Sequence, residues 1–233
     1  MSDPDNFSKY RAYLVSQKDR APLGTTSGLP FVTLSRQAGA GAETVAHLLA
    51  EKLNADLTAG AQPWTVFDKN LITKVLEDAD LPQEIAKLVL EDKDTTVQAI
   101  LGEVLGLHPS MWTIFHHTSD TILKLARIGR CIIVGRGSEI ITAKLKSGIH
   151  IRLIAPESTR LAHLEKHFHL DAKAAAKYLH DHDEGRRRYV KSNFQSDIDD
   201  PTLYHATLNT GLLSFDRTAD LVARLVMDQS NKN

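Results

Sequence analysis

The chain has 233 residues, of which 42% are hydrophobic, and this fits one α/β domain with insertions better than two domains. The 28 Lys and Arg residues nearly balance the 29 Asp and Glu residues, giving a formal net charge of -1, which argues against general nucleic-acid binding. No segment approaches the roughly 18 consecutive apolar residues of a membrane span. The N-terminal residues lack the apolar run of a secretory signal, and the single cysteine, Cys131, cannot form an internal disulfide. We therefore expect a cytoplasmic protein without a membrane partner.

The first part of the chain predicts an extension followed by a strand, a loop and a helix. Residues 1–28 are polar and end in a stretch rich in Gly, Pro, Ser and Thr, so we expect an N-terminal extension, with one short helix near 10–17, ahead of a domain at 29–233. The apolar run at 30–34 predicts a strand. Residues at helical spacing predict a helix after it: Val45, Leu48, Leu49 and Leu53.

The remaining elements alternate between strands and helices. Short apolar runs predict further strands at 64–68, 131–135, 150–155 and 203–209. Helical patterns follow at 69–78, 171–191 and 215–227, and the stretch 81–128 has no strand signal and predicts a helical insertion. Helices that alternate with short buried strands indicate an open parallel sheet covered on both faces.

The segment SRQAGAGAET at residues 35–44 lies between the first strand and the first helix. Glycines at 39 and 41 allow successive backbone N–H groups to converge on phosphate oxygens, and the following helix offers its positive N-terminal end. The alternative is a turn whose glycines only let strand and helix pack closely. Against the pattern G-x-x-x-x-G-K-[ST], Arg36 stands at the first glycine and Ala42 at the lysine.

Six segments in order extend this signal: SRQAGAG (35–41), VFDKNLI (66–72), VGRG (134–137), APESTR (155–160), DEGRRRY (183–189) and DPTLYHATLNT (200–210). Their order and spacing resemble the nucleoside monophosphate kinases, most closely the cytidylate kinase-like family of P-loop proteins. The resemblance extends from about residue 30 to 226. It implies an α/β P-loop kinase three-layer sandwich with an open parallel sheet, a helical insertion at about 81–128 and an arginine-rich lid at about 171–195.

The resemblance also implies a set of binding residues. The donor phosphates would lie on Gln37, Ala38, Gly39, Ala40, Gly41, Ala42, Glu43 and Thr44, and the Thr44 hydroxyl would face Mg²⁺. Asp68 would lie beside the acceptor nucleotide, with a helix N-cap as the alternative. Arg136 would bind the acceptor phosphate, with a surface arginine whose stem is packed as the alternative. Arg160 would lie near the donor base, and an exposed helix arginine is its alternative.

Three successive arginines, 186 to 188, follow acidic residues at helix-pair spacing, and Asp183 with Arg186 matches the lid spacing D-x-x-R. One alternative is a solvated helix face with ion pairs. Three successive side chains point in different directions around a helix, however, so at least one should face inward. We expect Arg36, Arg186 and Arg188 to stabilise charge on the transferred group, and the lid to be better ordered with ligand.

Some departures from the family pattern leave two functions open. Val134 and Gly137 occupy positions where cytidylate kinases place acids, so contacts to metal and outer phosphates would come from residues such as Thr44, Asp68, Glu139 and Arg36. One function is transfer of the terminal phosphoryl group of ATP, with Mg²⁺, to a nucleoside monophosphate or similar acceptor. The other is a nucleotide-binding regulatory protein with little transferase activity. Both have nucleotides as partners, and an amphipathic insertion would offer a homodimer face.

The chain has 11 histidines, and His163, His167 and His169 lie close together in sequence. The first two have the i,i+4 spacing that can share a metal. No H-E-x-x-H motif or neighbouring cysteine accompanies them, and zinc needs about four ligands. We expect histidines on a helix surface rather than a metal site.

Overall fold

The computed structural model describes residues 28–58, 60–68 and 111–230. The expected helices near 10–17 and 69–78, and the insertion as far as residue 110, lie outside the described residues. The dimer face expected on that insertion stays a prediction for the same reason. No helix in the described ranges combines the length and apolar character needed to cross a membrane.

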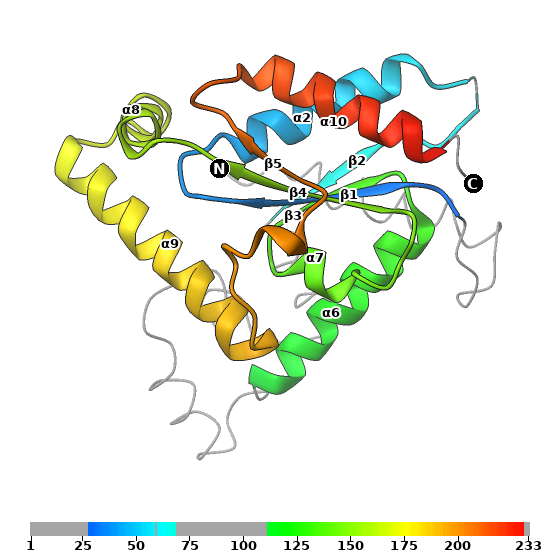
Figure 1. The fold of residues 1–233 in the computed structure, drawn as a ribbon, viewed down its shortest axis with the longest axis horizontal. Coiled ribbons are helices and arrows are strands. Elements are labelled where there is room, and N and C mark those ends of the chain that lie inside the picture. Colours follow the sequence, from blue (N-terminus) through cyan, green and yellow to red (C-terminus); the bar gives the residue numbers. More distant parts are fainter. Residues whose placement is uncertain (1–27, 59, 69–110, 231–233) are drawn as a thin grey trace.

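A five-stranded sheet forms the centre of the described structure (Figure 1). The strands are β1 (Phe31–Arg36), β2 (Thr65–Phe67), β3 (Cys131–Val134), β4 (Gly148–Ile154) and β5 (Ala206–Asn209). Their order is β2-β3-β1-β4-β5, and every neighbouring pair is parallel. The open parallel sheet predicted from the alternating pattern is confirmed, with strand ends shifted by at most three residues.

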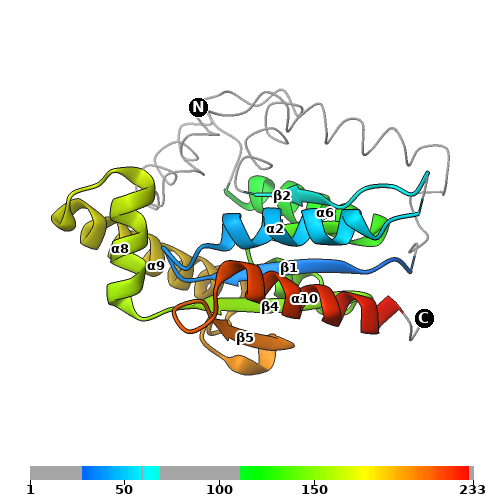
Figure 2. The same cartoon turned by 90° about the horizontal axis from the view of Figure 1, so that it is seen from above.

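Helices cover both faces of this sheet, as Figures 1 and 2 show. The described helices are α2 (Ala42–Ala55), α6 (Met111–Ile128), α7 (Ser138–Ile141), α8 (Glu157–Phe168), α9 (Ala172–Phe194) and α10 (Phe215–Ser230), with a short 3-10 turn at Pro201–Leu203. Helices α2 and α10 lie over one face, and α6 and α7 lie over the other. Helices α8 and α9 follow one another on one side of the molecule and cross at a large angle, since Figure 1 shows α8 end-on and α9 along its length.

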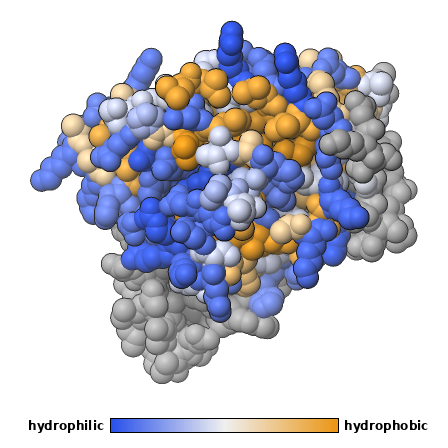
Figure 3. Space-filling view, viewed as in Figure 1, coloured by the Kyte–Doolittle hydropathy of each residue, from blue (hydrophilic) through white to orange (hydrophobic). Residues whose placement is uncertain are grey.

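Alternate side chains of the central strands enter two separate cores. Val32 and Leu34 of β1 pack under α2 and α10, whereas Phe31 packs with Ile122 and Leu125 of α6. Each face of the sheet therefore has an apolar core, as expected for a parallel sheet with helices on each side, although the face with Phe31 also buries Thr33 and His150. The face in Figure 3 is hydrophilic over α9 and more apolar over α10.

This topology places the loop between β1 and α2 at a predictable edge. Strand β1 lies in the middle of the order, with β3 on one side and β4 on the other. Ligands of open parallel sheets bind beyond the carboxyl ends of the strands, where the chain leaves in opposite directions. Figure 2 shows the loop after β1 at the end of the molecule where α8 lies.

His150, buried in β4, predicts a pH-dependent stability. Its Nδ1 lies 2.9 Å from the Thr33 hydroxyl, and burial, together with the charge of His205, lowers the pKa of His150 from 6.5 to about 4. Below pH 6.5 the His150 side chain binds a proton in the unfolded chain, whereas in the folded chain it stays neutral down to about pH 4. The free energy of unfolding should therefore fall by about 3 kcal/mol as pH drops from 6.5 to 4.

Urea unfolding of the wild type and His150→Gln between pH 4 and 7 tests this expectation. The glutamine variant should show a flatter profile over that window, because it has no imidazole to titrate. Parallel profiles for the two proteins would assign the acid sensitivity to other groups.

Candidate active site

Two glycines with left-handed backbone shape the loop between β1 and α2, residues 37–44, which we call the glycine loop. Gly39 has φ 74° and Gly41 has φ 77°, a region that costs most other residues energy. A side chain at Gly41 would also overlap the ring of Phe215. The close packing offered as the alternative role of these glycines is therefore present.

Several backbone N–H groups of the glycine loop nevertheless have no hydrogen-bond acceptor among the described residues, and we call them the open amides. The Ala40 amide donates to Gln37 O (3.2 Å), and Val45 donates to Gly41 O (2.9 Å) as α2 begins. Within the described part of the chain, five loop amides have no acceptor: those of Gly39, Gly41, Ala42, Glu43 and Thr44. Unpaired N–H groups at the start of a 14-residue helix can bind an anion by donating hydrogen bonds to it.

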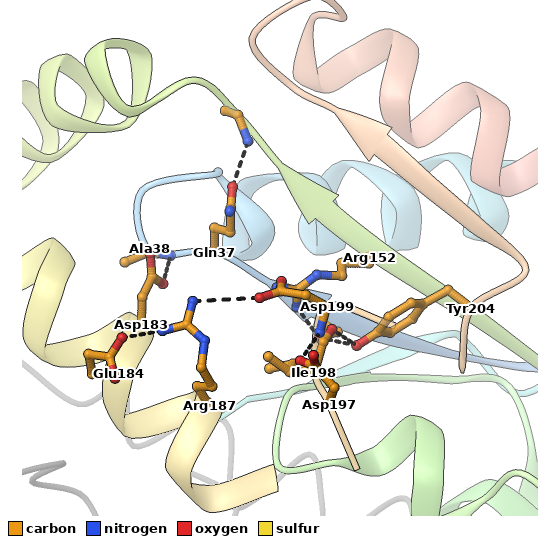
Figure 4. Close-up of polar contacts among 12 residues, drawn as sticks. Gln37, Ala38, Arg152, Asp183, Glu184, Arg187, Asp197, Ile198, Asp199 and Tyr204 are labelled. Carbon is orange, nitrogen blue, oxygen red and sulfur yellow. Dashed lines mark hydrogen bonds and ion pairs between the residues drawn. The ribbon is translucent and has the colours of Figure 1, made fainter. Parts of the chain in front are cut away.

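The side chains of Asp183 and Arg160 form hydrogen bonds with the backbone N–H and C=O of Ala38. We call this pair of residues the Ala38 clamp. The Ala38 amide donates to Asp183 Oδ1 (2.7 Å), as Figure 4 shows. The Ala38 carbonyl accepts from Arg160 Nη1 (3.2 Å). The same nitrogen donates to Asp183 Oδ2 (2.6 Å), and Arg160 Nε donates to Ala155 O (3.0 Å).

The clamp corrects two expectations. Arg160 is only 7% exposed, so the exposed helix arginine considered as its alternative is wrong, and its role beside a donor base stays a prediction. For Asp183, which matches the lid spacing with Arg186, the alternative was a solvated helix face with ion pairs; its carboxylate instead contacts Arg160 of α8 and the glycine loop. Asp181 does make a helix pair, with Lys177 (2.8 Å).

A cleft opens over the glycine loop. Its lining comprises Ser35, Arg36, Gln37, Ala38, Gly39, Gly41, Ala42, Glu43, Thr44, Gly135, Arg136, Gly137, Glu139, His163, Leu164, His167, Phe168, Tyr178, His182, Arg186, Tyr189, Val190 and Ile198. Most of the predicted donor phosphate residues are among these, including Thr44. Asp68, Arg160 and Arg188 are predicted site residues outside this lining.

Arg36 and Arg136 approach the cleft from neighbouring strands. The Arg36 guanidinium lies directly over Gly135, leaving no room for a side chain there. Arg136 itself has φ 63°, between glycines that also have positive φ. A non-glycine residue held in this region stores about 1 kcal/mol or more of strain. The turn after β3 therefore fixes Arg136 at the carboxyl edge of the sheet.

Glu139 is a buried acid in the cleft lining, only 3% exposed. Burial raises its pKa, while its own backbone amide and the charges of Arg152 and Arg36 oppose that rise. Its Oε2 has no hydrogen-bond partner among the described residues, and Oε1 lies 3.5 Å from the Tyr204 hydroxyl. Burial, followed by the Glu139 charge, raises the pKa of Tyr204 to about 12. The sequence named Glu139 as a substitute acid, but it could not indicate this burial.

The three arginines of α9 have different surroundings. Arg186 is half-buried and lines the cleft, which confirms that one of the three faces inward. Arg187 is exposed and pairs with Glu184, as a solvated helix face would. It also contacts Asp199, which pairs with Arg152 of β4 (Figure 4). Arg188 is exposed.

Histidines on the cleft lining are the site feature that the sequence missed. His163 was expected on a helix surface, but it is half-buried and its Nδ1 lies 2.9 Å from Gly39 O. His167 and His182 also line the cleft. Among the described residues, no three or more His, Cys, Asp or Glu side chains are grouped to hold a metal. Helical spacing alone does not say which face of α8 meets the glycine loop.

Comparison with solved structures found a similar fold in one protein and a weaker similarity in another. A structure of an uncharacterized protein from Eubacterium ventriosum is 19% identical, with a TM-score of 0.62 over 84% of this chain and 98% of that chain. Shikimate kinase from Bacteroides thetaiotaomicron is 12% identical, with a TM-score of 0.45 over 85% of this chain and 98% of the enzyme. Curated protein sequences gave no match.

The model of the cytidylate kinase-like family matches residues 31–212. This range begins with β1 and includes the glycine loop, the turn with Arg136, helices α8 and α9, and β5. A match to this family supports the function of a phosphotransferase in general. The chain belongs to the cytidylate kinase-like family.

Proposed function

We propose that this protein transfers the terminal phosphoryl group of ATP to a nucleoside monophosphate or a similar small acceptor. The observation that supports this most is one cleft that combines open loop amides with Arg36, Arg136 and Arg186. The arginines come from the end of β1, the turn after β3 and helix α9. Cations that converge from separate elements suit a ligand with several anionic groups.

The donor phosphates lie on the open amides at the start of α2, where the helix dipole adds to the attraction. Arg136, at the carboxyl edge of β3, binds the acceptor phosphate. Arg36 also lines this cleft, with its guanidinium over Gly135. The side chains of Arg36 and Arg136 therefore stabilise the charge that develops on the transferred phosphoryl group. This lowers the activation barrier only if both side chains are in position before the reaction.

Mg²⁺ accompanies ATP in this proposal. Oxygen ligands suit this ion, and the cleft offers the Thr44 hydroxyl together with the buried Glu139, whose Oε2 has no partner among the described residues. These two residues would hold the ion. When bound, Mg²⁺ would neutralise charge on the donor phosphates.

One observation favours the alternative, a nucleotide-binding regulatory protein with little transferase activity. Ala42 occupies the position of the loop lysine and is only 6% exposed, so the loop offers no cation of its own. Without another source of charge, the cleft would bind phosphate but stabilise its transfer poorly.

A transfer assay separates the two functions. Purified protein is incubated with ATP, Mg²⁺ and each common nucleoside monophosphate, and nucleoside diphosphate products are separated by chromatography. Formation of ADP together with a second diphosphate, above the level with no acceptor, supports the kinase. Nucleotide binding by calorimetry without transfer to any acceptor supports the regulatory protein.

A further inference from the structure

A second wall of the cleft is built from side-chain rings. Helix α8 contributes His163, His167 and Phe168, and α9 contributes Tyr178 and His182; we call these five residues the aromatic wall. Successive centroids are 5.5 Å, 5.0 Å, 5.7 Å and 3.9 Å apart along this order. The rings therefore form a continuous surface rather than isolated side chains.

The wall adjoins the glycine loop through His163. Because the Gly39 carbonyl can only accept, the Nδ1 atom of His163 carries the hydrogen in their 2.9 Å contact. The His163 ring also packs edge-on against the Phe215 ring, with centroids 5.4 Å apart. Phe215 in turn contacts Gly41 of the glycine loop. One end of the wall is thereby fixed to the loop whose amides are open.

The middle of the wall is accessible. Phe168 is 45% exposed, and His167 is also exposed. A single exposed phenylalanine is ordinary, but here it continues a ring surface in a concave site that also holds polar groups. Small-molecule sites combine apolar and aromatic lining with a few polar contacts in this way.

Arg160, the residue that the family resemblance places near the donor base, is held differently. Its guanidinium nitrogens donate to Ala155, Ala38 and Asp183, and it is nearly buried. The aromatic wall continues along the same helix, beginning one turn after Arg160. All five of its residues line the cleft, whereas Arg160 is absent from the cleft lining.

We propose that the aromatic wall binds the planar base of the nucleotide whose phosphates lie on the glycine loop. This inference rests on the phosphate site of the proposed function. Stacking against an aromatic ring is favourable for every base because each has a π face, and imidazole nitrogens can exchange hydrogen bonds with its edge. The ligand is thus a nucleoside polyphosphate rather than an inorganic polyphosphate.

Calorimetry with ATP and with inorganic tripolyphosphate, each with Mg²⁺, tests the proposal on the full chain. The wild type should bind ATP at least about 10-fold more tightly than tripolyphosphate. Phe168→Ala and His167→Ala should each weaken ATP binding by up to about 10-fold and leave tripolyphosphate binding unchanged. Phe168→Tyr and His167→Phe, which keep a ring, should retain most of the ATP affinity.

Two control variants match these changes in kind and lie outside the cleft lining. Leu212→Ala removes an apolar side chain that is 82% exposed, and His180→Ala removes an exposed histidine from α9. Both should bind ATP and tripolyphosphate as the wild type does.

Equal affinity of the wild type for the two ligands would overturn the base site, and so would alanine variants that weaken both ligands alike, since the wall would then serve only the phosphates. ATP binding that depends on the rings, without phosphoryl transfer, would support the base site and contradict the kinase. Binding of neither ligand would overturn both proposals.

Discussion

Replacing Arg36 with alanine should lower turnover by about 100-fold, the range seen when one charge-stabilising donor is removed. Arg36 lies over Gly135 in the cleft lining, whereas Ala42 provides no charge at the place of the loop lysine. As the bond to the leaving oxygen breaks, the transferred group needs a cation that is already in place. Steady-state assays of product formation measure the loss, and Arg36→Lys should restore part of it because the charge is kept.

Glu139 requires a control in this experiment. The charge of Arg36 opposes the rise of the Glu139 pKa, so Arg36→Ala could act by disturbing that buried acid. Glu139→Gln alone, and together with Arg36→Ala, separates the two effects. If the double variant regains the turnover of Glu139→Gln, Arg36 acts through the acid and not on the phosphoryl group. Arg224→Ala, an exposed arginine of α10, should leave turnover unchanged.

Arg136→Ala should give a different kinetic result. It should raise the KM for the acceptor more than it lowers kcat, because Arg136 is proposed to bind the acceptor phosphate in both the ground state and the transition state.

The local features of this fold could be predicted because they depend on neighbours in sequence. Glycines at 39 and 41 between an apolar run and a helical pattern predicted the turn, and both have the positive φ that only glycine adopts easily. The alternation of strands and helices predicted the parallel sheet. Strand ends were less certain, since the Ser35 and Arg36 positions of β1 are polar but still pair with β4.

The tertiary contacts of the site could not be predicted in this way. Asp183 contacts Ala38 across 145 positions and Arg160 across 23, and nothing in a charged run marks which acid turns inward. The run DEGRRRY contains residues of both kinds, because Glu184 and Arg187 pair near solvent whereas Asp183 contacts the glycine loop. Helical spacing gives a face, but only the packing of α8 on the loop decides what that face meets.

The Ala38 clamp should make Asp183 one of the most sensitive positions for stability. Asp183→Ala leaves Arg160, whose side chain is 8% exposed, without its carboxylate and leaves the Ala38 amide without an acceptor. Removing one partner of a buried pair costs about 3–5 kcal/mol. Asp183 is itself 19% exposed, so water can replace part of the contact and we expect the lower end, about 3 kcal/mol. Urea unfolding measures the change.

Asp181→Ala is the matched control, because it removes an acid two positions away whose partner, Lys177, is mostly exposed. It should change the free energy of unfolding by less than about 1 kcal/mol. The double variant Arg160→Met with Asp183→Ala removes both charges and keeps a long side chain at position 160, so it should be more stable than Asp183→Ala. If it is instead as unstable as Asp183→Ala, the cost comes from the lost contacts to Ala38 rather than from the unpaired arginine. If Asp183→Ala matches the wild type, the clamp does not stabilise the fold.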